Sequence, residues 1–204
     1  MAQLNLENYL SHKSANPPSY DLSQVKIGVI HMGLSAFHRG HQGLYFERIL
    51  RSGNLSFGVV GVTQRSSDVA DVMNSQDCLY TINEREGAGF TPIIVGAIRK
   101  AVFFPQAREE LLEIARSENL KLITLTVSEK AYQCNSSRDG INLSSTEVQA
   151  DIADVNSLLT FPSRLVDLLV ARFESGLPGV AVISCDNLPT NGDITGAVVL
   201  DLAS

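Results

Sequence analysis

The residues that follow the first apolar run of the chain have the types of a phosphate-binding turn. Residues 25–31 (VKIGVIH) are mostly apolar and rich in β-branched side chains, which predicts a buried strand. Gly33, Ser35 and His38 come next and occupy the three glycine positions of the pattern G-x-G-x-x-G. Such a turn, between a strand and a helix, brings backbone amides close to a dinucleotide pyrophosphate. Only the first position is glycine, so the pattern alone favours an ordinary turn. Its place directly after a strand is the context that binding requires.

The elements that would position this turn alternate along the chain. Apolar runs predict further strands at residues 57–63, 79–86, 91–98, 120–127 and 180–185. Helical spacing and capping residues predict helices at residues 40–50, 66–73, 105–117, 147–155, 162–174 and 191–202. Ser66 or Ser67 is the expected N-cap of the second of these helices.

This order of elements predicts the fold. The glycine-containing residues 86–89 predict an antiparallel hairpin between the strands at 79–86 and 91–98. The other strands alternate with helices, and their near-continuous apolar runs are typical of parallel sheets covered on both faces. We therefore predict an α/β fold with a Rossmann-like, doubly wound, mostly parallel sheet, short of the usual six strands and carrying a hairpin insertion. Residues 1–24 would form an N-terminal extension and residues 25–204 one dinucleotide-binding domain.

The composition excludes several classes of protein. The chain has 204 residues, 44% of them hydrophobic and 19% charged, with a formal net charge of −6. An acidic chain binds polyanions poorly, so we expect no nucleic-acid or membrane partner. The three cysteines lie far apart without C-x-x-C spacing, which predicts neither a disulfide framework nor a zinc site. Residues 1–20 lack an apolar core of signal-peptide length, and no stretch approaches ~20 apolar residues. We therefore expect a cytoplasmic protein.

Three segments at the ends of expected strands resemble the motifs of one family. Residues 33–42 (GLSAFHRGHQ) resemble G-x-G-x-F-H-R-x-H-Q, and residues 124–132 (TLTVSEKAY) are similar to T-x-T-V-T-E-K-G-Y. Residues 184–192 (SCDNLPTNG) nearly reproduce S-C-D-N-L-P-x-N-G. On these motifs the chain, from about Val25 onward, is identified as a member of the mannitol dehydrogenase family. This family of polyol-specific long-chain dehydrogenases includes mannitol dehydrogenases and fructuronate (mannonate) and tagaturonate reductases.

The resemblance implies a role for each matching residue. The dinucleotide phosphates would be cradled by Gly33, Leu34, Ser35, Ala36, Phe37 and His38. Val127 and Ser128 would line the cofactor and substrate cleft, and Glu129 would lie near a proton path. Asn187 would hold the substrate oxygen that becomes a carbonyl or alkoxide, where an amide donor stabilises the developing negative charge. Without the resemblance, Glu129 with its neighbour Lys130 would be interpreted as a surface ion pair, and Asn187 as part of an Asx-type turn.

Residues near the end of the second strand bear on the choice of cofactor. NAD-specific folds keep an acidic residue there to bind the ribose hydroxyls. Here Arg65 and two serines follow the strand, and the nearest acid is Asp68. Arg65 could accept a 2′-phosphate, stack on the adenine or meet solvent. We therefore expect NAD or NADP, with NAD as the default of the family.

Two other features have simpler interpretations. His38 and His41 are spaced like a metal pair, but no third ligand is in view, so we expect no metal. His38 and Arg39 are instead expected to pack and hydrogen-bond beneath the turn. Cys185 lies inside an expected buried strand and would be an inert core thiol.

The proton-transferring base of the resembled family is missing. Hydride transfer from an alcohol needs a base, which in the family is the lysine of K-x-x-x-x-N-x-x-H in a helical second domain. None of the five lysines begins this motif: Lys13, Lys26, Lys100, Lys121 and Lys130. We therefore expect the cofactor-binding domain of an oxidoreductase, with the catalytic C-terminal domain absent. The parent enzyme would transfer hydride between NAD(P) and a linear polyol or sugar acid, of the mannitol/fructose or mannonate/fructuronate type.

The chain alone is expected to bind dinucleotide weakly or not at all and to be inactive. Its expected partners are a small-molecule polyol or sugar acid and its own missing domain. We also expect the isolated chain to self-associate through the apolar face where that domain would dock. The alternative is a non-catalytic nucleotide-sensing or interaction module with a Rossmann fold, which Ser35 and the missing base favour.

Overall fold

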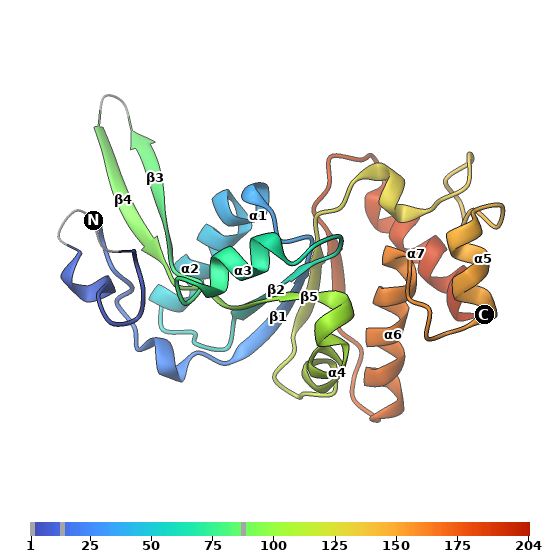
Figure 1. Cartoon of the computed structure of the whole chain (residues 1–204), viewed down its shortest axis with the longest axis horizontal. Coiled ribbons are helices and arrows are strands. Elements are labelled where there is room, and N and C mark those ends of the chain that lie inside the picture. The colour runs from blue at the N-terminus through green and yellow to red at the C-terminus, as the bar shows by residue number, and fades with distance from the viewer. Residues whose placement is uncertain (1–2, 13–14, 87–88) are drawn as a thin grey trace. The chain divides into compact units, whose positions relative to one another are not determined.

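The computed structural model describes residues 3–12, 15–86 and 89–204 (Figure 1). The chain divides into two compact units, residues 1–107 with 119–121, and residues 108–118 with 122–204. The first boundary falls at Ala107, whose non-helical backbone (φ −125°, ψ 19°) interrupts helix α4 (Phe104–Ala115). In the described part of the chain, no helix combines the length and the apolar character needed to cross a membrane.

Three parallel strands form the centre of the first unit. They are β1 (Ile27–Met32), β2 (Gly58–Thr63) and β5 (Ile98–Phe103), and β2 pairs with both of the others. All six residues of β2 are buried, as expected for a strand of a sheet that is covered on both faces. The helices of this unit are α1 (Ala36–Gly40), α2 (Gln42–Arg51) and α3 (Asp68–Asn74).

Strand β5 was not predicted from the sequence. The expected strand at 91–98 ends where β5 begins, because Arg99 and Lys100 interrupt the apolar run. In the structure these two side chains are partly or fully exposed, whereas Ala101 and Val102 are buried beside β2. The second discrepancy is at α3, where the backbone of Ser67 is already helical and its side chain caps nothing. The Ser66 hydroxyl donates to Asp68 instead.

The predicted antiparallel hairpin is confirmed. It consists of β3 (Tyr80–Glu86) and β4 (Gly89–Val95), paired from Tyr80 opposite Val95 to Glu86 opposite Gly89. Its turn at 87–88 lies outside the described residues. Figure 1 shows the hairpin extending away from the helices of the first unit.

The residues before β1 pack onto this hairpin. They include two short 3-10 helices, η1 (Tyr9–Ser11) and η2 (Leu22–Gln24). Leu22 forms a buried cluster with Leu79 and Ile94 of the hairpin region. The segment that the sequence indicates as an extension is therefore packed into the first unit.

A buried carboxylate ties the same region to α2. Glu47 is fully buried and accepts hydrogen bonds from the Tyr20 hydroxyl at 2.7 Å, the Gly96 amide at 2.8 Å and the Arg51 Nε at 2.7 Å. A buried charge is tolerated only when it is paired and hydrogen-bonded in this way. Burial raises the pKa of the Tyr20 hydroxyl, and Glu47 adds to this effect, so Tyr20 stays a neutral donor.

The second unit contains the remaining strands and most of the later helices. Strands β6 (Leu122–Leu125) and β7 (Ala181–Ser184) pair in parallel. The helices are the part of α4 from residue 108 onward, α5 (Thr146–Ala153), α6 (Phe161–Glu174) and α7 (Asn191–Ala203), with η3 (Glu129–Tyr132) after β6. The topology of the parallel strands is a five-stranded sheet in the order β5-β2-β1-β6-β7, which confirms the predicted fold class.

The prediction that residues 180–185 form a fully buried strand is wrong. Residues along β7 alternate between exposed and partly exposed, and Ile183 retains 43% of its accessible surface. The reason is that β7 is the last strand in the sheet order, with a neighbour on one side. Cys185 follows β7 rather than lying inside it and is partly exposed, so it is not a core thiol.

Candidate functional site

The turn after β1 is fixed by backbone hydrogen bonds to β2. Gly33 has φ +111°, a conformation that glycine adopts without the steric cost paid by other residues. The amides of Gly33 and Leu34 both donate to the Val62 carbonyl, at 2.9 and 3.0 Å. Leu34 is buried, and a Cβ on Gly61 would meet its side chain at 2.9 Å. Leu34 therefore packs the turn onto β2.

Ser35 caps a helix that begins earlier than predicted. The sequence places the helix start at Gly40, whereas α1 begins at Ala36. Ser35 has extended backbone, and its hydroxyl accepts a hydrogen bond from the His38 amide at 3.4 Å, as an N-cap residue does. Residues 36–38 are consequently the first turn of α1 and not loop. The departure from glycine thus has a local structural reason that the glycine pattern alone does not reveal.

Two stacked histidines lie under this turn. His31 and His38 are both fully buried, and their ring centroids are 3.4 Å apart with 19° between the planes. His38 Nδ1 donates to the Gln42 side-chain oxygen at 3.0 Å, which leaves the unprotonated Nε2 buried without a partner among the described residues. His31 forms a hydrogen bond with the backbone of Gly33.

Burial controls the protonation of both rings. It lowers the pKa of His38 to about 4, against a weaker opposite effect of the hydrogen bond to Gln42, and Arg39 and His41 disfavour the charged form further. Burial also lowers the pKa of His31, and its proximity to His38 adds to that. Both rings are therefore neutral near pH 7. Neutral rings can stack closely, whereas two imidazolium ions at this separation would repel each other.

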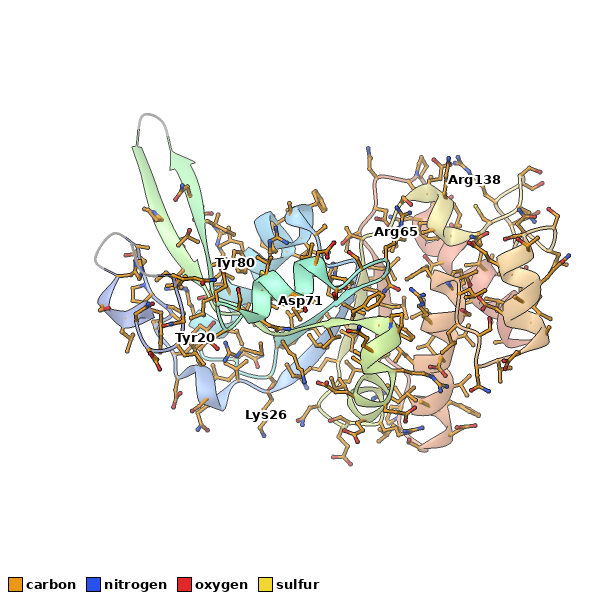
Figure 2. All side chains as sticks on the ribbon, in the orientation of Figure 1. Tyr20, Lys26, Arg65, Asp71, Tyr80 and Arg138 are labelled. Carbon is orange, nitrogen blue, oxygen red and sulfur yellow. The ribbon has the colours of Figure 1, made fainter. Side chains whose placement is uncertain are left out.

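Phe37 and Arg65 are exposed on the first unit. Phe37 keeps 56% of its surface accessible, and its ring lies 5.3 Å from that of His41. Arg65 follows the end of β2, in a turn where the Thr63 hydroxyl donates to the Ser66 carbonyl at 2.7 Å. Figure 2 labels Arg65 at this turn. Within the described residues, no group of three His, Cys, Asp or Glu side chains gathers as a metal site would require.

The ends of the two strands of the second unit are joined by one side chain. The parallel ladder ends with Leu125 opposite Ser184 and a hydrogen bond from the Cys185 amide to the Leu125 carbonyl at 2.9 Å. Beyond it, the Val127 amide donates to Asp186 Oδ1 at 2.8 Å. The Tyr132 hydroxyl donates to the other oxygen, Oδ2, at 2.5 Å.

Tyr132 and Asp186 were not selected from the sequence. Both belong to the family-like segments, but Tyr132 is fully buried and Asp186 partly buried, and only the structure shows that they meet. Burial is the main cause that raises the pKa of each group. For Asp186 the hydrogen bonds from Tyr132 and the Val127 amide act in the opposite direction. The sequence signal that could have indicated this contact is a tyrosine and an aspartate that each follow a predicted strand.

The other expected site residues of this unit are exposed. Ser128 is the N-cap residue of η3, and Asn187 lies in the turn that follows Asp186. Glu129 forms an ion pair with Arg138, not with the neighbouring Lys130. The structure thus joins Val127 to Asp186, the residue before Asn187. The side chains of Ser128, Glu129 and Asn187 are exposed to solvent.

The parallel sheet, with a glycine turn after its first strand and polar residues after later strands, defines a Rossmann-type domain. A family profile described as the mannitol dehydrogenase Rossmann domain matches residues 27–204, and the chain belongs to this family.

Comparison with individual proteins agrees with this assignment. Mannitol 2-dehydrogenase from Pyricularia oryzae is 35% identical over 191 residues, which are 91% of this chain and 38% of that protein. Polyol:NADP oxidoreductase from Gluconobacter oxydans is 29% identical over 91% of this chain and 39% of its own length. The solved ternary complex of Pseudomonas fluorescens mannitol 2-dehydrogenase with NAD and D-mannitol superposes with a TM-score of 0.91, at 28% identity, over 99% of this chain and 42% of that one. The chain therefore spans about two fifths of the length of these relatives.

Proposed function

We propose that this chain is the cofactor-binding domain of an oxidoreductase that transfers hydride between NAD(P) and a linear polyol or sugar acid. The observation that carries the proposal is the family match over residues 27–204, with all three family-like segments placed at strand ends. Because the match spans both compact units, we propose that they belong to one dinucleotide-binding domain, as expected for residues 25–204. Mannitol/fructose and mannonate/fructuronate remain the proposed substrate pairs.

The rest of the enzyme is part of the proposal. The named relatives are more than twice as long as this chain, which supports a further catalytic domain that carries the base and most substrate-reading side chains. We call this chain together with that domain the complete protein. The cytoplasmic location of the protein and the self-association of the isolated chain stay predictions.

The residues of the first unit fit a dinucleotide. Gly33 lets the backbone turn without a side chain, and the buried Nε2 of His38, an acceptor without a partner among the described residues, can accept from a donor such as a ribose hydroxyl but not from a phosphate oxygen. Since the Gly33 and Leu34 amides are already bonded to Val62, we assign the phosphate contacts mainly to residues 35–37. When bound, the nicotinamide supplies the carbon that accepts or donates hydride.

The second unit would supply the polar groups around the reacting oxygen. The exposed amide of Asn187 can donate to an oxygen that gains negative charge as hydride moves. Val127 and Ser128 would line the cleft, and Glu129, which forms an ion pair with Arg138, would lie near the proton path. The alternative hypothesis of a non-catalytic sensing module is weakened. Ser35, which stands in place of a motif glycine, caps α1 and so does not indicate a lost nucleotide site.

Cofactor preference is tested by reversing the charge of Arg65. In the complete protein, Arg65→Asp should weaken NADPH binding by about 10-fold, because it removes a charge-assisted phosphate contact and adds repulsion. NADH binding should be retained. Lys26→Asp is the matched control, since Lys26 is exposed before the start of β1 and lies far from Arg65 (Figure 2).

The measurement is a fluorescence titration of NADH and NADPH against wild type and both variants, with the isolated chain in parallel. Unchanged affinities for both nucleotides in Arg65→Asp would place Arg65 outside the cofactor site. Negligible binding by every form of the complete protein would remove the cofactor assignment and leave only the fold.

A further inference from the structure

The carboxylate of Asp186 replaces a backbone carbonyl at the end of the sheet. The β6–β7 ladder is regular up to Leu125 and Ser184 and closes with the bond from the Cys185 amide. Beyond β6, the Val127 amide donates to Asp186 Oδ1 at 2.8 Å. The two chain segments therefore stay in register past the last ladder bond, through a side chain.

Tyr132 fixes the other oxygen of the same carboxylate. Its hydroxyl donates to Asp186 Oδ2 and lies 2.6 Å from the Ser184 hydroxyl, which in turn lies 3.3 Å from the same Asp186 oxygen. The ring is fully buried and packs edge-on against Phe161 at a centroid distance of 6.1 Å. A buried phenol with defined partners holds its hydroxyl in one place, so Asp186 is clamped and not merely solvated.

The backbone of Asp186 is held as well. The Asn191 side-chain amide donates to the Asp186 carbonyl at 2.9 Å. Thr190, directly before α7, has a left-handed backbone (φ +55°), which makes the turn from Asp186 to Asn191 tight. Asn187 is thus the exposed second residue of a turn whose first residue is fixed through both its carboxylate and its carbonyl.

We propose that Asp186 and Tyr132 are positioning residues for Asn187 and for the Val127–Ser128 segment. They lock the two strand-end segments to each other, so that the Asn187 amide is presented in one orientation before substrate binds. This inference rests on the proposed role of Asn187 in binding the substrate oxygen. An amide donor lowers a barrier most when its position is set in advance and needs no reorganisation during reaction.

The test measures steady-state polyol oxidation by the complete protein with Asp186→Asn, Tyr132→Phe and the double variant. Each single variant should lower kcat by about 10- to 100-fold, the size of loss that a misplaced reacting group causes. The KM for the nucleotide should change much less than kcat, because the phosphate contacts are assigned to residues 35–37 and only the Val127–Ser128 part of the cofactor contact depends on Asp186 and Tyr132. The double variant should be hardly slower than the singles, because both substitutions open the same clamp.

Asp151→Asn is the matched structural control. Asp151 is a buried carboxylate that accepts from the Ser157 hydroxyl at 2.6 Å and from the Leu159 and Thr160 amides at 2.7 and 2.9 Å, and neither it nor these partners belong to the family-like segments. This variant should lower Tm but keep kcat. In the isolated chain, hydrogen exchange at the Val127 amide should rise in Asp186→Asn and stay unchanged in Asp151→Asn.

The possible outcomes separate the two claims. If Asn187→Ala lowers kcat but Asp186→Asn and Tyr132→Phe lower only Tm, the positioning role is wrong and the proposed function stands. If Asn187→Ala itself keeps wild-type kcat, the role of Asn187 in the proposed function fails, and the positioning role fails with it. A loss of kcat in Asp151→Asn equal to that in Asp186→Asn would also contradict the inference, because the effect would then be general destabilisation.

Discussion

Replacing Gly33 by valine should weaken nucleotide binding to the complete protein by more than about 100-fold. Gly33 has φ +111°, and a β-branched residue in that region is strained by steric clashes that glycine does not have. The turn cannot relax freely, because the Gly33 and Leu34 amides are bound to Val62 and the Gly33 backbone is held by His31. The added side chain would also occupy the side from which a pyrophosphate must approach.

Gly53→Val separates loss of binding from strain. Gly53 has φ +95°, lies after α2 in an exposed position, and a Cβ there would meet nothing within 4 Å. Both variants should lose stability by a similar amount, on the order of 1–2 kcal/mol, from the same backbone strain. Only Gly33→Val should lose NADH affinity in a calorimetric titration. Equal affinities in the two variants would show that the turn does not bind the cofactor.

Acid should destabilise the chain through the stacked histidines. The pKa of His38 in the folded state is about 4, against 6.5 in the unfolded chain, so the unfolded state binds more protons between these values. The free energy of unfolding must then fall as pH falls from about 6.5 to about 4, and stay reduced below that. A shift of this size corresponds to about 3 kcal/mol, and the lowered pKa of His31 acts in the same direction.

Urea unfolding of the isolated chain between pH 7 and pH 4 measures this dependence. His38→Gln should flatten the fall in the free energy of unfolding, whereas His41→Gln, at an exposed position beside it, should reduce the fall only slightly, because His41 is the smallest of the causes that lower the pKa of His38. Imidazole NMR signals give a second readout that needs no variant, since the His38 ring should remain neutral at pH 5.5. A His38 ring that protonates near pH 6.5, or a His38→Gln variant with the wild-type pH profile, would contradict the burial of a neutral stack.

Patterns along the chain predicted most of the fold, because buried parallel strands are apolar along their whole length. The glycine turn could be placed after β1 for that reason, and the hairpin followed from its alternating residues and glycines. Strand β5 was not recognised because Arg99 and Lys100, its second and third residues, are partly or fully exposed, and a solvated charge costs little there. The burial of β7 was overestimated because strand composition does not tell which strand lies last in the order.

The sequence predicted individual residues of the site but not the contacts between them. Ser35 was interpreted as an imperfect glycine, since a motif comparison does not consider that α1 needs a cap. The pairing of His31 with His38 could not be predicted, because it depends on how the first turn of α1 folds back under the strand end. Likewise, Asp186 and Tyr132 are 54 residues apart, and only the pairing of β6 with β7 brings them together.

The most direct test of the proposed function is a polyol oxidation assay that follows NADH and NADPH formation at constant pH. It compares the complete protein with the 204-residue chain, using mannitol, other linear polyols and aldonates such as mannonate with each nucleotide. We predict that the complete protein reduces NAD(P) with at least one of these substrates and that the isolated chain reduces none. Oxidation by the chain alone, or a complete protein inactive on all of them with both nucleotides, would contradict the account.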